Sequence, residues 1–328
     1  MYWYYKIPLT ILLIAMLLGF GVLGWRGLVR PLLKKGDKPQ PPVAVNPPVE
    51  KPVATPAPVP KETEPVRPPV QAQDKPSSSV AALIKSAEDA MFADNPRRAR
   101  EIASSILKSG QCKEYDDEWI KAADIVNEAN RIFMNSKAPC PEKRTYVVVS
   151  GDNLTRVAYR NNATIGALQR LNGLNTTSDV IRPGDALQYL AGTWSIKVSK
   201  SHFLLCLYLD DELYRIYRVS IGRQDRTPAG TFIIKDKEIN PAWTPPGLSI
   251  PYGDPRNILG TRWMGLKPTG ETDQTLRGYG IHGTTEPESI GTAASLGCVR
   301  MRNEEVEELY DFIPMAFEKN PITVLIEE

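Results

Sequence analysis

Proline is concentrated in one segment near the N-terminus, which limits what the first quarter of the chain can form. Residues 36–79 hold 13 of the chain's 29 prolines, among Ala, Val, Lys, Glu, Gln and Ser. Proline lacks the backbone N–H that helices and inner strands need, so this composition favours extended polyproline II. Its 44 residues could reach roughly 130 Å at about 3.1 Å per residue. We expect a linker; a ligand for proline-binding domains is the alternative.

An apolar run precedes this linker. Residues 7–25 contain no charged side chain and are flanked by Lys6 and Arg26. The run is long enough to cross a hydrocarbon core as a helix, so we predict a membrane anchor over residues 1–35. A cleaved signal peptide is the alternative. The basic residues after the run favour a cytoplasmic location for the rest of the chain, although long domains cross membranes largely regardless of flanking charge.

Overall composition argues against several classes of function. The 40 Lys and Arg residues nearly balance the 38 Asp and Glu residues, and no basic run is interleaved with aromatic residues. Nucleic-acid binding is therefore not expected. The chain has only two His and four Cys, without the spacing of zinc ligands. We expect no metal and no cofactor.

Residues 80–140 carry apolar residues at helical spacing. Breaks at residues 94–96 and at Gly110 predict three helices, loosely like one tetratricopeptide repeat with a capping helix. One such unit buries little, so we expect a spacer or a docking surface for a protein partner. Cys112 and Cys140 bracket the third helix and invite a disulfide in an oxidising compartment. Against it, a helix of about twenty residues holds its ends roughly 30 Å apart, while a bridge needs Cα atoms within about 7 Å.

Residues 145–191 have the pattern of a strand, two short helices and a strand. Asp152 is placed to cap the first helix. The segment resembles the LysM module in the sequences Tyr-Val-Val-Val-Ser-Gly-Asp-Asn-Leu, Leu-Asn-Gly-Leu and Ile-Arg-Pro-Gly-Asp-Ala-Leu, with Asn153 where Thr is more usual. The resemblance implies binding to the N-acetylglucosamine-containing glycan of peptidoglycan. A LysM fold that no longer binds sugar is the alternative.

Residues 193–328 read mostly as strands. Alternating apolar residues predict strands over 194–198, 203–209 and 213–219, with a hairpin turn at 210–212. A short helix is expected near the C-terminus, with Asn303 as its cap, and residues 322–326 are expected to close the sheet. The predicted fold class is therefore multidomain, with a transmembrane helix, a linker, a small helical region, a βααβ module and a mostly-β domain.

Within this last domain, His282 and Cys298 lie sixteen residues apart. A thiolate is a strong nucleophile, and a neighbouring imidazole lowers the thiol pKa, so the pair predicts acyl transfer. The remaining candidates have plainer interpretations. His202 is expected at the surface, and Cys206 is expected to be a buried, inert thiol within an apolar strand.

The same residues resemble the L,D-transpeptidase catalytic domain of the YkuD type. The motifs that carry the resemblance are Thr-Pro-Ala-Gly-Thr-Phe, Ile-His-Gly-Thr and Ser-Leu-Gly-Cys-Val-Arg-Met, with Asn303 just beyond. Leu296 stands where many members carry a second His. We interpret this change as altering a subsite or the local amides, not as removing the base.

The resemblance implies a role for each site residue. Cys298 would be the nucleophile and His282 the base, oriented by the carbonyl of Gly283. Backbone N–H groups near Gly297 and Cys298 would meet the oxyanion, and Ser295 is grouped with them. Arg300 would hold a substrate carboxylate or brace the loop.

The implied function is peptidoglycan L,D-transpeptidation on stem tetrapeptides through a thioester, serving cell-wall biogenesis and cell shape. An L,D-carboxypeptidase or amidase of the same fold, or a non-catalytic wall-binding scaffold, are the alternatives. The expected location is a single pass in the inner or cytoplasmic membrane, with the catalytic part in the periplasm or cell-wall space.

Overall fold

The computed structural model describes residues 79–174, 180–314 and 320–328, all within one compact unit, Ala72–Glu328. The predicted anchor at residues 1–35 and nearly all of the linker at 36–79 lie outside the described residues. Across the described part of the chain, no helix combines the length and the apolar character needed to cross a bilayer. The anchor and the linker therefore stay predictions.

Three helices form the start of the described chain, as the sequence predicts. Each begins at a side chain that accepts a hydrogen bond from the first turn, namely Ser79, Asn95 and Asp116. Gly110, with φ of 67°, ends the second helix in the left-handed conformation that glycine adopts at low cost. The helices are α1 Val80–Phe92, α2 Pro96–Ser109 and α3 Asp117–Met134.

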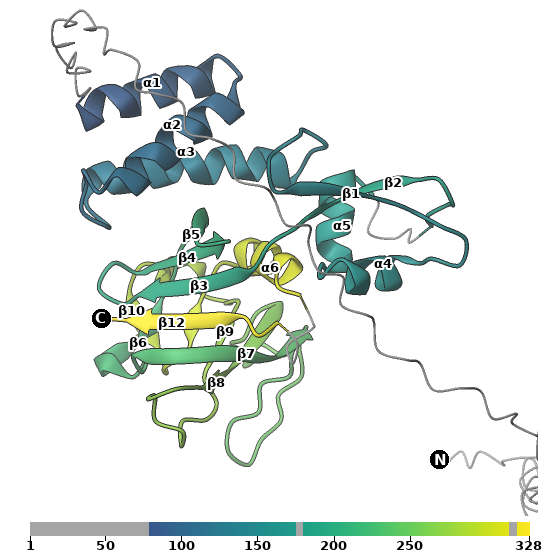
Figure 1. Cartoon of the computed structure of the whole chain (residues 1–328). Coiled ribbons are helices and arrows are strands. Elements are labelled where there is room, and N and C mark those ends of the chain that lie inside the picture. The colour runs from purple at the N-terminus through teal and green to yellow at the C-terminus, as the bar shows by residue number, and fades with distance from the viewer. Residues whose placement is uncertain (1–78, 175–179, 315–319) are drawn as a thin grey trace, which may run out of the picture. The chain divides into compact units, whose positions relative to one another are not determined.

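Helix α3 contacts both its neighbouring helices and the sheet. One face packs small residues, Ala122 and Val126, against α1 and α2. The other face places Trp119 and Ala123 against Cys206 of strand β4, Leu204–Leu209, and Ile216 of strand β5, Glu212–Arg218. Figure 1 shows α3 beside β5. The helical region is thus attached to the sheet and is not a free spacer.

Cys112 and Cys140 do not form the disulfide that their positions invite. Both thiols are free. Cys112 packs among the helices, whereas Cys140 packs against the core of the sheet. The two ends of α3 are therefore not linked by a disulfide.

The βααβ module is formed as predicted. Its strands pair antiparallel, and its core includes Val148, Leu154, Val157, Leu168 and Leu187. The elements are β1 Lys143–Val147, α4 Leu154–Arg160, α5 Ile165–Asn172 and β2 Ala186–Leu190.

The predicted cap of α4 is wrong by one residue. Asn153, not Asp152, accepts the hydrogen bond from the Arg156 N–H, at 2.9 Å. The Asp152 carboxylate instead accepts from the Tyr146 hydroxyl at 2.7 Å, from the Val149 N–H at 3.0 Å and from Arg160 Nη1, at the end of α4, at 2.6 Å. Asn153 therefore does the capping at the position where Thr is more usual in LysM modules.

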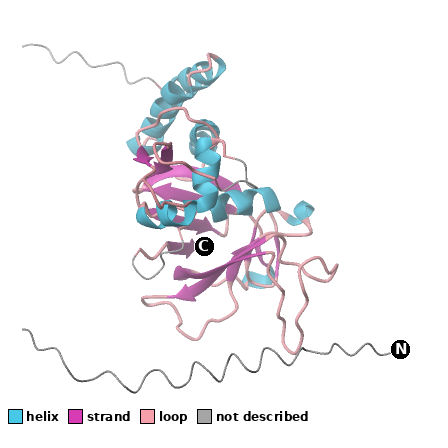
Figure 2. Ribbon diagram, turned by 90° about the vertical axis from the view of Figure 1, so that its right-hand side faces the viewer, coloured by secondary structure: helices cyan, strands magenta, loops and turns pink. Residues whose placement is uncertain are grey.

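Eight strands build the main sheet, in the order β11-β9-β8-β7-β12-β3-β4-β5. Figure 1 shows this succession from β5, beside α3, to β8, and Figure 2 shows how strongly the strand directions differ across the sheet. In chain order they are β3 Trp194–Ser199, β4 Leu204–Leu209, β5 Glu212–Arg218, β7 Gly230–Ile239, β8 Arg262–Pro268, β9 Gly280–His282, β11 Val299–Arg300 and β12 Thr323–Glu327.

The predicted hairpin and closing strand are confirmed. Asp210 and Asp211 both have positive φ, 50° and 63°, as a two-residue turn between β4 and β5 requires. Strand β12 enters the middle of the sheet, parallel to β3 and antiparallel to β7. The last strand of the chain thus joins the two halves of the sheet.

The sheet curls until its two ends meet. Beyond β5, Ser220 and Arg300 exchange backbone hydrogen bonds of 2.9 and 2.8 Å, which link the β5 end to β11 at the other end. A short parallel pair, β6 Ile221–Gly222 with β10 Ala293–Ser295, continues this closure. The residues on either side of Cys298 are thereby held from two directions.

Helix α6, Asn303–Phe312, covers one face of the curled sheet. Its Val306, Leu309 and Phe312 belong to the same core cluster as Met264 and Ile281 of the sheet. That face is therefore filled with apolar side chains, and the catalytic candidates lie on the other.

A buried ionic cluster joins α3, β5 and α6. Arg215 donates to the Glu308 carboxylate through Nε at 2.8 Å and through Nη2 at 2.5 Å, and the Tyr217 hydroxyl donates to the same oxygen at 2.9 Å. The Arg215 Nη1 donates to the Asn127 side-chain oxygen at 2.6 Å. Because all of these groups are removed from water, each depends on the others for a partner.

We expect Glu308→Ala to lower the free energy of unfolding by about 3–5 kcal/mol, because it leaves the Arg215 charge buried without a carboxylate. Urea unfolding of the full chain measures this loss. Glu101→Ala, which breaks an exposed pair with Arg97 on α2, is the control and should cost less than about 1 kcal/mol. Equal losses in the two variants would contradict the interpretation.

Candidate active site

Parallel pairing of β11 with β9 brings Cys298 and His282 to one region of the sheet. Val299 lies opposite Ile281 in this pairing, and Arg300 lies opposite His282. Successive side chains of a strand point to alternate faces, so Cys298 is on the His282 side and Val299 is in the core. Cys298 and His282, sixteen residues apart in the sequence, thus lie at two adjacent strands.

His282 is held as a neutral imidazole. It is 2% exposed, and its Nδ1 lies 2.6 Å from the Gly283 carbonyl oxygen. A carbonyl only accepts, so Nδ1 carries the proton and Nε2 is left as the basic nitrogen of the neutral ring. Burial lowers the pKa of His282 to about 4, assisted by the Arg300 charge and opposed by the carbonyls of Gly283 and Leu259.

Trp263 supports the imidazole from the neighbouring strand. The two residues are paired across β8 and β9, and their rings stack with centroids 5.9 Å apart and an interplanar angle of 26°. A Cβ on Gly280 would lie 2.5 Å from the indole, so glycine is needed for the indole to lie over the strand. Trp263 is a site residue that the sequence motifs do not indicate.

Cys298 is a protonated thiol in this resting structure. Its Sγ donates to the Gly278 carbonyl oxygen at 3.5 Å. Burial raises the pKa of Cys298 to about 11, against the lowering effects of a backbone hydrogen bond to Gly280 and of the Arg300 charge. The sequence predicts an imidazole that lowers the thiol pKa. The structure differs because the buried imidazole is neutral and has no charge to stabilise a thiolate.

The turn before Cys298 is held by Ser295 and Thr227. The Ser295 hydroxyl donates to the Cys298 carbonyl oxygen at 2.6 Å and accepts from the Gly297 N–H at 3.0 Å. The Thr227 hydroxyl donates to the Gly297 carbonyl oxygen at 2.8 Å and accepts from the Gly222 N–H at 2.6 Å. The Gly297 N–H, expected to meet an oxyanion, is therefore engaged with Ser295 at rest.

Thr227 belongs to the Thr-Pro-Ala-Gly motif that the sequence singles out without giving it a role. The Thr227 hydroxyl contacts Gly297, seventy residues later in the chain. This contact explains why the motif and the cysteine turn occur together. Gly297 itself has φ of 141°, and a Cβ there would lie 3.0 Å from the Tyr279 ring. The turn therefore requires glycine for both conformation and space.

Asn303 does not cap α6 as predicted. Arg302 occupies the cap position without a side-chain hydrogen bond, and Asn303 is the first helical residue. Its Oδ1 accepts from the N–H groups of Thr261 and Thr284 at 3.2 Å each, and its Nδ2 donates to the Thr284 carbonyl oxygen at 2.9 Å. The side chain thus joins α6 to the two loops beside His282.

Glycines make room for this amide. A Cβ on Gly260 or on Gly283 would lie 2.2 Å from the Asn303 Oδ1. Gly283 is also the residue whose carbonyl orients His282, and its N–H donates to the Arg262 carbonyl oxygen at 3.2 Å. The Asn303 contacts therefore fix the segment on which the His282 tautomer depends.

Arg300 is buried opposite His282. Its Nη1 lies 3.0 Å from a carboxylate oxygen of Glu286, whereas its Nε has no hydrogen-bond partner. The ion pair with Glu286 fits the prediction that Arg300 braces the loop. The Arg300 Nε is still free to donate to a ligand oxygen. Leu296, where many relatives carry His, is 52% exposed and lies outside the buried part of the turn.

The plainer candidates lie where they were expected. His202 is exposed, stacks on Tyr115 with centroids 4.6 Å apart, and contacts the Ser199 hydroxyl at 2.8 Å. Cys206 is fully buried, and burial raises its thiol pKa to about 12. Within the described ranges, no three His, Cys, Asp or Glu residues are grouped as a metal site would need.

Comparisons with known proteins assign two regions of the chain to families. The L,D-transpeptidase catalytic domain family, YkuD, matches residues 193–324, and the LysM domain family matches residues 146–188. The L,D-transpeptidase YqjB of Bacillus subtilis is 39% identical over 127 residues, which are 38% of this chain and 69% of YqjB. The L,D-transpeptidase YkuD of the same organism is 32% identical over 176 residues, 52% of this chain and 93% of YkuD.

A solved structure also resembles the chain. An L,D-transpeptidase from Mycobacterium smegmatis aligns with a TM-score of 0.32 and 18% identity, over 44% of this chain and 64% of that one.

The buried His282 predicts an acid-sensitive stability. Its folded pKa of about 4 lies below the ordinary 6.5, so the unfolded chain takes up the proton first. The free energy of unfolding should therefore fall as pH drops from 6.5 to about 4, by up to about 3 kcal/mol from this residue.

Replacing the imidazole tests this linkage. His282→Gln should flatten the fall in unfolding free energy, measured by urea unfolding at a series of pH values. His202→Gln, which removes the exposed histidine, is the matched control and should retain the wild-type profile. Parallel profiles for wild type and His282→Gln would show that the imidazole is not buried in its neutral form.

Proposed function

The chain belongs to the YkuD family of L,D-transpeptidases, and we propose that Cys298 is the nucleophile with which it acts on peptidoglycan stem tetrapeptides. The chain is an L,D-transpeptidase with a LysM domain. The observation that carries the proposal is the pairing of β11 with β9, which puts the half-buried Cys298 on the face of the neutral, oriented His282. A thiol beside a neutral imidazole is the arrangement that nucleophilic catalysis needs.

The first half-reaction that we propose transfers the stem peptide to the thiol. The Cys298 sulfur attacks the carbonyl carbon after the L-centre of the third stem residue, and the thiol proton passes to His282 Nε2. The carbonyl oxygen takes up the negative charge and returns it as the C–N bond breaks. The departing D-alanine nitrogen takes the proton from His282, which leaves a thioester on Cys298 and a neutral imidazole.

The pKa values of Cys298 and His282 before substrate binds indicate when the proton leaves the thiol. Burial holds the thiol pKa at about 11 and the imidazole pKa at about 4, so an ion pair is disfavoured before substrate binds. The proton therefore leaves the thiol as the sulfur–carbon bond forms, when charge moves to the carbonyl oxygen. Backbone N–H groups of the cysteine turn are the proposed partners of that oxyanion, with the Gly297 N–H exchanging Ser295 for the substrate.

The thioester has two fates. An amine from a second stem gives a cross-link, with His282 accepting its proton, whereas water gives a trimmed tripeptide. The family supports the first outcome, and the second makes an L,D-carboxypeptidase the alternative. The His282–Cys298 arrangement disfavours a non-catalytic scaffold, whereas an amidase that releases attached protein would use the same two residues.

We further propose that the LysM domain binds the peptidoglycan glycan and that residues 7–25 anchor the chain in the membrane. The LysM match supports glycan binding, and the apolar run supports the anchor. The substrate requires that the catalytic domain face the periplasm or cell-wall space. A protein partner on the helical region stays a prediction, with one face of α3 already packed on the sheet.

Loss of Cys298 tests the nucleophile. We expect the full chain with Cys298→Ala to release no D-alanine and to form no cross-linked dimers from disaccharide tetrapeptides, as monitored by chromatography and mass spectrometry. Wild type should give dimers, and tripeptides alone would favour the hydrolase. Cys112→Ala, a thiol in the helical region, is the control and should retain activity. Turnover by Cys298→Ala would exclude the proposed mechanism.

Asn303 is expected to act as a positioning residue. Asn303→Ala removes three hydrogen bonds from the loops beside His282, so kcat should fall about tenfold or more with little change in KM. The acid limb of the kcat/KM profile should also shift, because His282 loses its fixed environment. A lowered Tm alone would not change that limb.

A conservative variant separates positioning from folding. Asn303→Asp keeps an acceptor for the Thr261 and Thr284 N–H groups but loses the donor to the Thr284 carbonyl. Its kcat should lie between those of wild type and Asn303→Ala. A wild-type kcat in a folded Asn303→Ala variant would contradict the positioning role.

A further inference from the structure

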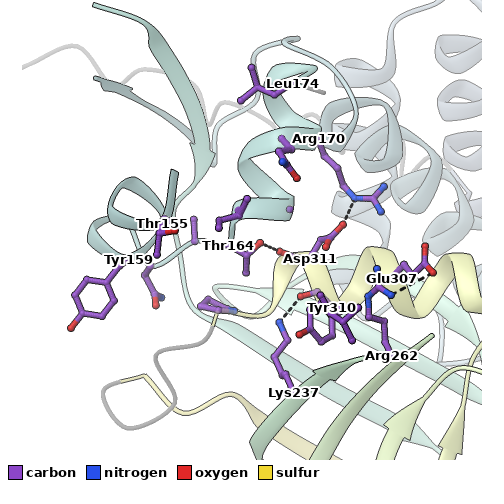
Figure 3. Close-up of a pocket in the computed structure, with 18 of the residues that line it drawn as sticks. Thr155, Tyr159, Thr164, Arg170, Leu174, Lys237, Arg262, Glu307, Tyr310 and Asp311 are labelled. Atoms are coloured by element: carbon purple, nitrogen blue, oxygen red, sulfur yellow. Dashed lines mark hydrogen bonds and ion pairs between the residues drawn. The ribbon is translucent and has the colours of Figure 1, made fainter. Parts of the chain in front are cut away.

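A cavity lies away from Cys298, between the LysM domain and the catalytic domain. Its volume is about 860 Å³, within the range of roughly 300–1,000 Å³ typical of small-molecule sites. Helices α4 and α5 form one wall, and α6 with β7 and β8 forms the other (Figure 3). Arg262 and Trp263 are adjacent on β8 and point to opposite faces, so the cavity is on the far side of the sheet from His282.

Asp311 joins the two walls. Its carboxylate accepts from Arg170 Nε at 2.6 Å, and its carbonyl oxygen accepts from the Thr164 hydroxyl (Figure 3). A Cβ on Gly166 would lie 2.2 Å from the Asp311 carboxylate, so the start of α5 approaches α6 as closely as glycine allows. The cavity is therefore bounded by specific contacts between the two domains.

Two buried polar atoms at this cavity have no partner. Asn162 Oδ1 is an acceptor from the α4–α5 connection, and Arg262 Nε is a donor from β8. A buried polar atom without a partner costs free energy that a ligand can recover. Asn162 requires a ligand N–H or O–H, and Arg262 requires a ligand oxygen.

The charges favour an anionic ligand at Arg262. Three basic side chains, Arg170, Lys237 and Arg262, line the cavity with two carboxylates, Glu307 and Asp311, and burial lowers the pKa of Lys237 to about 7. Arg170 is committed to Asp311, and Lys237 Nζ donates to the Tyr310 carbonyl oxygen at 2.6 Å. Arg262 Nη1 lies a looser 3.7 Å from Glu307 and donates to the Thr261 carbonyl oxygen at 2.8 Å, while its Nε has no partner. Arg262 is therefore the cation with capacity for a ligand carboxylate.

The rest of the lining suits a sugar ring. Tyr159 stands at the rim with 65% of its surface exposed, and Ile239 on the other wall is 59% exposed. Ala158 and Thr155 also line the cavity on the α4 side. Apolar surface beside an amide and a hydroxyl can contact both the C–H face and the polar edge of a saccharide.

We propose that this cavity binds an N-acetylated amino sugar that carries a carboxylate, of the muramic-acid type, as a second glycan site shared by the two domains. The acetamido N–H donates to Asn162 Oδ1, the carboxylate accepts from Arg262 Nε, and the ring lies against Tyr159. This inference rests on the proposed function, because it takes peptidoglycan as the polymer on which the enzyme works.

The site is connected to the catalytic base. The Arg262 carbonyl oxygen accepts from the Gly283 N–H at 3.2 Å, and the Gly283 carbonyl oxygen holds His282 Nδ1 at 2.6 Å. A ligand on Arg262 is thus two hydrogen bonds from the imidazole. A substrate that includes the glycan should consequently be turned over faster than the same stem peptide without sugar.

Calorimetric titration of the full chain tests the cavity. All variants carry Cys298→Ala, so that binding is measured without turnover. The probes are a GlcNAc–MurNAc tetrapeptide and a neutral GlcNAc oligomer. Asn162→Gly is compatible with the backbone, because Asn162 has φ of 48°. Asn162→Gly and Arg262→Gln should each weaken binding of the muramyl probe at least about fivefold. Arg262→Gln should leave binding of the neutral oligomer unchanged.

Matched variants keep the test decisive. Arg156→Gln removes an exposed LysM arginine outside the cavity and should bind both probes like the parent. Tyr159→Ala, at the rim, provides a further variant if Arg262→Gln does not fold. Parental affinity for the muramyl probe in folded Asn162→Gly and Tyr159→Ala would overturn the site.

The two proposals fail in different ways. If the cavity variants bind the muramyl probe like the parent, and the chain with Cys298 intact converts tetrapeptides, only the proposal of the cavity site is wrong. If these variants bind the muramyl probe more weakly, and the chain with Cys298 intact converts no tetrapeptide, the proposed function is wrong and the cavity is still a saccharide site.

Discussion

The parallel pairing of β11 with β9 is the contact on which the active site depends. It sets Arg300 opposite His282 and carries Cys298 to the same face, although neither strand exceeds three residues. Strands this short supply few hydrogen bonds of their own. Their register instead depends on Ser220 at the closing edge, on the packing of Ile281 and Val299 in the core, and on the Met301 N–H, which donates to the His282 carbonyl oxygen at 2.9 Å.

Burial gives this site its chemical character. Removing the imidazole and the thiol from water favours the uncharged form of both, so the resting enzyme holds a neutral pair. In the proposed mechanism, such a pair reacts only when a carbonyl is available to accept charge. The orientation of the imidazole must then be built in beforehand, and Gly283, Asn303 and Trp263 supply it from three elements.

The domains before the catalytic sheet are attached by polar contacts as well as apolar packing. Arg215 joins α3, β5 and α6 in one buried cluster, and Asp311 joins α6 to the LysM helix α5. These contacts give the LysM domain a defined surface toward α6, where the cavity between the two domains lies. The proposed glycan site depends on that attachment, because neither domain alone contains both Asn162 and Arg262.

Local patterns in the sequence were sufficient for many of the elements, and they also supplied the candidates for the reactive residues. Apolar periodicity and breaker residues placed the three helices, the βααβ module and the Asp210–Asp211 hairpin, because each depends on neighbours in the chain. The rarity of His and Cys, together with the motifs around them, identified Cys298 and His282. The same local reasoning failed for the helix caps, since Asp152 and Asn303 have several partners within reach and tertiary contacts decide among them.

Only the tertiary structure decided the environment of these groups. The neutral state of the His282–Cys298 pair, the use of the Gly297 N–H by Ser295 and the unbridged Cys112 and Cys140 all depend on burial and on partners distant in sequence. Residue type determines which atom can donate, accept or attack. The surroundings of that atom are set by packing, because water exclusion and long-range pairing arise only when the sheet has curled and the helices have covered it.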